Sequence, residues 1–182
     1  MYMRMKILAA LFGLLVPFAA PAKDYVVKSP SGHLTVKVST GKALTWQVSF
    51  KGHEIIRPSR LAVKLDNGIV WGSDAPKGKS GNISRTLPGI NYRKARIVDN
   101  YTFLVLKGKG YSVELRAYDD AAAYRFMANA SDSLTVENET VEYNFNKDYE
   151  AFVPYVNDLR NGERYSNSFE AYYDRQKISQ MP

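Results

Sequence analysis

Leu44-Thr45-Trp46-Gln47-Val48-Ser49-Phe50 carries the clearest structural signal in this 182-residue chain. Apolar and polar side chains alternate along it, which places Leu44, Trp46, Val48 and Phe50 on one face. A period of two residues is typical of a β-strand with one buried and one solvated face. Working outward, we find further strand-forming segments at 34–38, 61–65, 69–71, 94–98, 101–106, 111–118, 123–128 and 140–145.

Turn signals separate these segments. Asn67-Gly68 is the strongest short hairpin signal, and Lys51-Gly52-His53, 107–110 and Asp119-Asp120 mark further turns. Between Gly72 and Asn91 Gly, Ser, Lys and Pro dominate, so we expect a long exposed loop there. No segment of useful length after residue 22 has a helical period. Strands at spacings of about 8–12 residues predict an all-β fold, an antiparallel β-sandwich or barrel.

The N-terminus reads as a targeting segment. Arg4 and Lys6 precede an apolar run at 7–18, and Ala20-Pro21-Ala22 supplies small residues for cleavage. The run is shorter than the roughly 20 residues that a membrane-spanning helix needs. We therefore predict a secretory signal peptide over residues 1–22 and an exported domain over 23–182, with a buried N-terminal helix as the alternative. Because no cysteine is available for lipidation, we expect a periplasmic location.

Composition excludes several classes of site. Without cysteine the chain has no disulfide framework, thiolate metal site or cysteine nucleophile. The formal net charge is +7, but the basic residues are spread out, whereas nucleic-acid binders tend to cluster them. The sequence also lacks the Gly-x-Ser-x-Gly elbow, the P-loop, the dinucleotide-binding motif and the spacing typical of zinc ligands.

The acidic side chains give no catalytic pair. Glycoside hydrolysis needs two carboxylates about 5–9.5 Å apart, but strand alternation directs Glu114 and Glu142 outward. Glu137, Glu139 and Glu142 gather around a turn. We interpret all of these as solvated residues at strand surfaces and ends, and we assign no catalytic residue.

Two other residue types could carry chemistry. His33 and His53 lie beside glycines in expected turns, so we interpret both as surface residues. Asp119-Asp120 could bind a hard cation, but aspartate side chains commonly stabilise turns by bonding to nearby backbone amides. The residues by themselves thus point to a fold and leave the function open.

A resemblance to a known family runs from Ser29 to Tyr173. Its motifs are Ser29-Pro30-Ser31-Gly32-His33-Leu34-Thr35-Val36, the segment 46–61, and Glu114-Leu115-Arg116-Ala117-Tyr118-Asp119-Asp120 followed by Ala123-Tyr124-Arg125-Phe126. In order and spacing they resemble the N-terminal domain of glycoside hydrolase family 97. Ala121 departs from the family pattern, which has glycine at this turn.

The resemblance implies a β-super-sandwich of the galactose-mutarotase type, followed by a (β/α)8 catalytic barrel and a small C-terminal sandwich. Family members are exo-acting α-glucosidases or α-galactosidases with a calcium ion at the active site. The catalytic carboxylates belong to the barrel. We therefore expect a sandwich that packs on a barrel missing from this chain, helps form the calcium and substrate site, and is inactive alone.

The segment from Tyr149 to Tyr173 loses clean alternation and mixes tyrosines with polar residues. No closing element is expected before Pro182, so we predict a sandwich that is incomplete at its C-terminus. The family contributes a glutamate from such a loop to calcium, which makes Glu170 the implied metal ligand, with a solvated loop residue as the alternative. Two other functions remain open: a free-standing periplasmic carbohydrate-binding sandwich, and an inert remnant of a broken reading frame.

Overall fold

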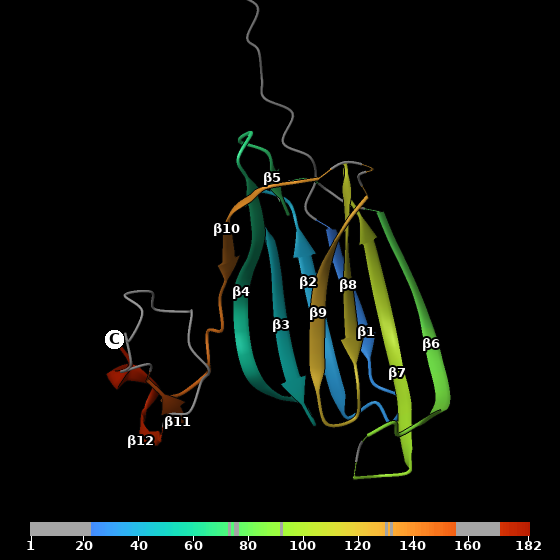
Figure 1. Cartoon of the computed structure of the whole chain (residues 1–182), viewed down its shortest axis with the longest axis vertical. Helices are drawn as coiled ribbons and strands as arrows, with labels where there is room; N and C mark the ends of the chain where they lie inside the picture. The colour runs from blue at the N-terminus through green and yellow to red at the C-terminus, as the bar shows by residue number, and fades with distance from the viewer. Residues whose placement is uncertain are drawn as a thin grey trace, which may run out of the picture.

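The structure is a computed structural model that describes residues 23–72, 74, 77–91, 93–129, 131, 133–155 and 172–182. Strands form nearly all of its regular structure (Figure 1). They are β1 (Lys23–Lys28), β2 (Leu34–Thr40), β3 (Leu44–Phe50), β4 (His53–Leu65), β5 (Val70–Trp71), β6 (Lys77–Pro88), β7 (Arg96–Lys107), β8 (Tyr111–Ala117), β9 (Ala122–Ala128), β10 (Val136–Val141), β11 (Glu150–Pro154) and β12 (Tyr173–Lys177). A short 3-10 helix, Ile178–Gln180, follows β12.

Two antiparallel sheets face each other. The six-stranded sheet has the order β1-β2-β3-β4-β10, with β5 paired to β4, and the four-stranded sheet has the order β6-β7-β8-β9. Strands β11 and β12 pair with each other in a separate two-stranded sheet. This arrangement confirms the predicted all-β antiparallel sandwich (Figure 1).

The core forms where alternation predicted it. In β3, Leu44, Trp46 and Val48 are buried, whereas Phe50 at the strand end keeps 37% of its surface exposed. In β8, the alternate residues from Tyr111 to Ala117 point inward from the opposite sheet and are fully buried. Each large apolar side chain removed from water contributes about 1.5–3 kcal/mol, so these two strands, one from each sheet, supply a large share of the stability.

The predicted hairpin at Asn67-Gly68 is confirmed. Gly68 has a φ of 81°, and its N–H donates to the Leu65 carbonyl at 3.0 Å. The Asn67 side chain accepts from the N–H of Ile69 at 3.1 Å. This turn reverses the chain between β4 and β5, and the turns expected at 51–53, 107–110 and 119–120 also join consecutive strands.

The expectation of a loop from Gly72 to Asn91 is wrong over most of its length. Strand β6 occupies Lys77–Pro88 and pairs with β7 from end to end. Its glycines are packing residues: a Cβ atom at Gly78 would overlap the Tyr25 ring, and one at Gly81 would lie 2.7 Å from the Phe103 ring. The glycine content that suggested a loop therefore reflects aromatic rings lying against a strand.

Three further boundaries differ from the expectation. The segments at 94–98 and 101–106 belong to one strand, β7, and β10 begins at Val136 and ends before most of 140–145. The tail also contains two strands that the sequence did not predict, β11 and β12, which pair with each other and join neither sheet of the sandwich. These strands are short and mostly exposed, which leaves little alternation to detect.

Candidate functional site

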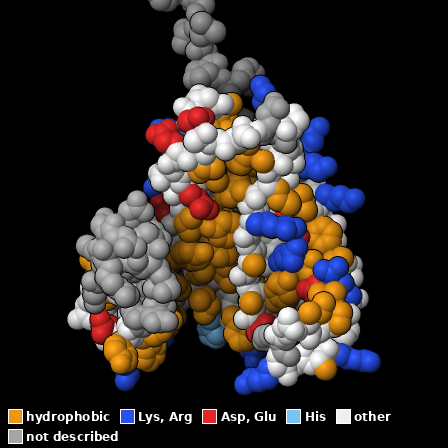
Figure 2. Space-filling view, in the orientation of Figure 1, with side chains coloured by type: hydrophobic (Ala, Val, Ile, Leu, Met, Phe, Trp, Pro, Cys, Tyr) orange, Lys and Arg blue, Asp and Glu red, His pale blue; other side chains and the backbone are white. Residues whose placement is uncertain are grey.

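The two sheets are in contact along one side and separate along the other. On the first side β1 packs against β7 and β8, and β2 packs against β8. Farther across, β9 lies opposite β3, where the rings of Tyr124 and Trp46 are 5.4 Å apart between centroids. Beyond this contact the structure has a groove of about 1330 Å³, visible as an apolar hollow in Figure 2.

Apolar side chains from both sheets line the groove. Trp46 and Val48 of β3 form its floor, and Tyr124 and Phe126 of β9 form one wall. Near β10 the cover is incomplete, and the exposed large apolar side chains there are Leu134 at 39%, Val136 at 55% and Tyr143 at 49%. Contiguous exposed apolar surface of this kind is typical of an interaction site.

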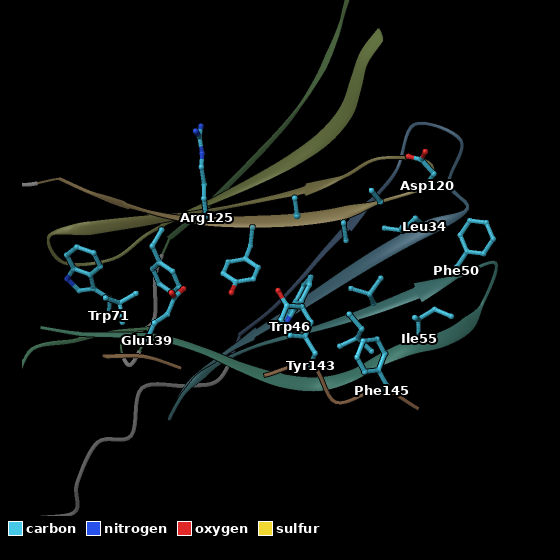
Figure 3. A pocket seen from close by; sticks show the side chains of 18 of the residues that line it. Leu34, Trp46, Phe50, Ile55, Trp71, Asp120, Arg125, Glu139, Tyr143 and Phe145 are labelled. Carbon is cyan, nitrogen blue, oxygen red and sulfur yellow. The ribbon is translucent and has the colours of Figure 1, made fainter. Parts of the chain in front are cut away.

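One carboxylate points into this apolar surface. Glu139 lies directly opposite the buried Val63 in the β10–β4 pairing, so it shares the inward face of the sheet. Figure 3 shows Glu139 pointing into the groove and Arg125 pointing away from it. Burial raises the pKa of Tyr124, and Tyr143 and the charge of Glu139 raise it further. None of the ion pairs among the described residues includes Glu139.

The groove does not offer the paired carboxylates of a glycosidase. Its second acid, Asp120, lies toward the opposite end from Glu139 in Figure 3. A hydrolase would need both groups to flank one glycosidic bond. The apolar lining is instead suited to covering by another piece of protein.

A charged network crosses the outer face of the four-stranded sheet. Glu114 accepts from Arg116 at 2.8 Å and pairs with Arg125 at 2.5 Å. Arg116 also lies over the ring of Tyr101, 4.5 Å from its centroid. Burial raises the pKa of Glu114, but the hydrogen bonds from Arg116 and Arg125 outweigh it, so the pKa lies below its ordinary value.

This network corrects the interpretation of Glu114 as a solvated residue. Its side chain is only 9% exposed although it faces outward, because Arg116 and Arg125 cover it. The other predicted acids behave more as expected: Glu137 pairs with Lys64, and Glu142 pairs with Arg60 at 2.6 Å. Hydrogen bonds from Arg60 hold the pKa of Glu142 below its usual value.

The histidines and the aspartate turn have structural positions. His33 and His53 are exposed at turns, as predicted. Asp119 accepts from the N–H of Ser31 at 2.8 Å, and hydrogen bonds from the side chain and the backbone of Ser31 lower the pKa of Asp119. Ala121 closes the turn by accepting from the N–H of Tyr118 at 2.8 Å, and its backbone is not in the left-handed region, so the family's glycine is not required here.

Sequence reasoning missed a smaller hollow of about 460 Å³ near β5. There the Tyr111 ring stacks on Trp71 at 5.5 Å, and its hydroxyl donates to Asp74 and accepts from the N–H of Gly72. Burial raises the pKa of Tyr111, and Asp74 raises it further. The stacking and these hydrogen bonds tie Tyr111 of β8 to the β5 end of the sandwich.

Comparison with known proteins decides the family. The Glycosyl-hydrolase 97 N-terminal family profile matches residues 27–182. The chain belongs to glycoside hydrolase family 97. A retaining alpha-galactosidase of this kind from Bacteroides thetaiotaomicron is 33% identical over 165 residues, covering 87% of this chain and 25% of the relative. The chain thus spans about a quarter of that relative's length.

Solved structures share the fold. A family 97 enzyme from Pseudoalteromonas sp. strain K8 in complex with acarbose superposes with a TM-score of 0.67 at 16% identity, covering 84% of this chain and 24% of that one. A beta-arabinopyranosidase superposes with a TM-score of 0.69 at 19% identity, covering 84% and 26%. These likenesses show a shared fold, and the profile match identifies the sandwich as the N-terminal domain of family 97 glycoside hydrolases.

The described residues do not form a site for the metal that the family implies. Within the described ranges, no three acidic or histidine side chains gather into a group that could hold an ion. Calcium prefers six to eight oxygen ligands, so these residues do not supply a family 97 calcium site. Glu170 lies outside the described residues, and its role as a ligand stays a prediction.

The predicted signal peptide, residues 1–22, also lies outside the described residues. In the part of the chain that the structure does describe, no helix has the length and apolar character to cross a membrane. The export of this family 97 domain stays a prediction.

Proposed function

We propose that this domain packs on the catalytic barrel of an exo-acting α-glycosidase and helps to complete its substrate site. The observation that carries the proposal is the open apolar groove in a chain that spans a quarter of a homologous alpha-galactosidase. An apolar surface of this extent is costly to leave in water, and covering it with further polypeptide of the longer enzyme removes that cost.

The described acids support a non-catalytic role for the isolated domain. Glu114, Glu137 and Glu142 are each held by a lysine or arginine. A general acid needs a raised pKa, whereas hydrogen bonds from arginines hold the pKa of Glu114 and of Glu142 below the ordinary value. We expect the catalytic carboxylates in the barrel and no turnover by this chain alone.

The substrate proposed is a terminal α-galactoside of an oligosaccharide. The 33% identity to a retaining alpha-galactosidase favours this sugar over an α-glucoside, although acarbose is the ligand of one structurally similar family member. Retention would require two barrel carboxylates about 5–5.5 Å apart.

Glu170 is the one residue of this chain that we propose as a calcium ligand. Its carboxylate would supply one hard oxygen ligand, and the rest would come from outside this chain. In the longer protein, Glu170→Gln should weaken calcium binding and activity while the sandwich melts at an unchanged temperature. Unchanged calcium affinity would favour the alternative that Glu170 is a solvated loop residue with no role in calcium binding.

The deciding experiment expresses the chain alone and together with the reading frame downstream of Pro182. We expect hydrolysis of p-nitrophenyl α-galactoside by the longer protein only, in a periplasmic fraction. Absence of such a frame, or turnover by the short chain, would contradict the proposal. Calorimetric binding of melibiose or maltose by the short chain would favour a free-standing carbohydrate-binding sandwich instead.

A further inference from the structure

The two sheets do not have matching widths. Counting across the sandwich, β8 faces β2 and β9 faces β3. Strands β4 and β10 lie beyond β3 in the six-stranded sheet, and among the described strands the four-stranded sheet has none past β9 to cover them (Figure 1). Because neighbouring strands are about 4.8 Å apart in both sheets, two additional strands beside β9 would extend the shorter sheet over β4 and β10.

The exposed edge of β9 has a definable set of hydrogen-bonding groups. Tyr118 donates to the Ala121 carbonyl, and Asn129 donates to the Gly110 carbonyl, which fixes the pattern along the β8–β9 ladder. Hydrogen-bonded residues alternate in an antiparallel pair, so Ala123, Arg125 and Met127 bond to β8. The backbone N–H and C=O groups of Tyr124, Phe126 and Ala128 therefore face away from β8, toward the open side.

The side chains at the same positions face the groove. Tyr124 lies opposite Leu115, and Phe126 lies opposite Val113, both of which belong to the core. A strand added to β9 would thus gain backbone hydrogen bonds at the edge and apolar contacts in the groove together. This is the combination by which proteins recognise an extended segment through strand addition.

Glu139 adds a requirement on the chemistry of that segment. Covering the groove would remove its carboxylate from water, and a buried charge without a partner is strongly destabilising. The covering strands must therefore bring a lysine, arginine or hydrogen-bond donor opposite Glu139. The charge on the groove wall thus complements a mostly apolar segment with one basic position.

We propose that a β-hairpin from polypeptide outside this chain adds to the free edge of β9, covers β4 and β10, and pairs a basic side chain with Glu139. The inference rests on the proposed function, since it takes the hairpin to come from the remaining three quarters of the enzyme. It differs from simple domain packing because the groove is filled by strands of the same sandwich before any barrel is reached.

Amide hydrogen exchange tests the strand addition. In the short chain we expect protected amides at Ala123, Arg125 and Met127, and fast exchange at Tyr124, Phe126 and Ala128. In the longer protein the latter three should exchange about 100-fold more slowly or better, as amides in a sheet interior do. Protection of all six in the short chain, or fast exchange of the three in the longer protein, would overturn the proposal.

Glu139→Leu tests the charge requirement, with Glu137→Leu on the solvent side of β10 as the control. In the short chain Glu139→Leu should leave the melting temperature unchanged or raise it. In the longer protein Glu139→Leu should lower the melting temperature by about 5–10 °C, because a buried cation loses its partner. The control, Glu137→Leu, should shift the melting temperature by about 2 °C or less. A rise in the melting temperature of both proteins on Glu139→Leu would overturn the proposal that a basic side chain pairs with Glu139.

The two proposals fail separately. Glycosidase activity of the longer protein together with fast amide exchange at Tyr124 would refute the added hairpin and support the proposed glycosidase function. Protection at Tyr124 in a longer protein without glycosidase activity would keep the hairpin and refute the glycosidase.

Discussion

Replacing Glu114 with glutamine removes the one buried charge among the described residues. The substitution keeps the shape of the side chain but exchanges a carboxylate that binds Arg116 and Arg125 for a neutral amide. Arg116 is 26% exposed and held over Tyr101, whereas Arg125 is 58% exposed. The two arginines should therefore respond differently to the loss.

The magnitude follows from these exposures. A hydrogen bond to a charged group contributes about 1.5–3 kcal/mol. Arg125 returns to water at little cost because it is largely solvated already, so we count the bond to Arg116 alone. The expected loss in the free energy of unfolding is about 2 kcal/mol, or about 4–8 °C in melting temperature for a domain of this size.

Urea unfolding of the parent chain and of Glu114→Gln at several pH values provides the assay. Because the folded-state pKa of Glu114 lies below its ordinary value of 4.5, its stabilisation is complete above that pH. It is lost as the pH falls through the folded-state pKa. The difference between parent and variant should thus be constant near neutrality and disappear in acid.

Glu137→Gln is the matched control, since the pair between Glu137 and Lys64 is about half exposed on both sides. Exposed pairs contribute about 0–1 kcal/mol. Equal losses for Glu114→Gln and Glu137→Gln would refute the reasoning, as would a difference that persists undiminished at about pH 2.

Two further substitutions probe the packing. Ser59→Ala should cost about 1–3 kcal/mol, because the fully buried Ser59 hydroxyl accepts from the N–H of Asn144 at 2.9 Å; a loss under about 0.5 kcal/mol in urea unfolding would show that Asn144 finds another partner. Gly78→Val should cost about 1–3 kcal/mol because the new side chain meets the Tyr25 ring. Ser80→Val, exposed on the same strand, should change stability by about 0.5 kcal/mol or less, and equal effects of the two valines would show that the Tyr25 ring does not restrict the residue at position 78.

Local pattern was sufficient to predict the strands that have two distinct faces. In β3 and β8 the alternation of apolar residues is unbroken, and every apolar position is buried except Phe50 at the end of β3. The turn at Asn67-Gly68 could be predicted because those two residues alone supply what it needs: the positive φ of Gly68 and the hydrogen bond that the Asn67 side chain accepts. The family resemblance added the identity of the domain, which the profile match over residues 27–182 confirmed.

The site could not be predicted in the same way because it depends on pairings between distant segments. Ser59 and Asn144 are 85 residues apart in sequence, and their contact places β10 beside β4. That pairing is what turns Glu139 toward the groove, where it stays exposed to solvent as the sequence suggested. Glu114 was misread for a related reason: its outward direction was correct, but the arginines that cover it come partly from β9.

The return of the chain to β4 has a consequence for folding in time. During synthesis β1 to β4 emerge as a local meander, but their sheet waits for β10, which follows all of β6 to β9. Sandwiches rich in such distant contacts typically fold in milliseconds to seconds, and until then Trp46 lacks the rings of Tyr124 and Tyr143 that pack on it. Over that interval the nascent protein exposes apolar, aggregation-prone surface, so its yield in a cell should depend on chaperone supply during synthesis.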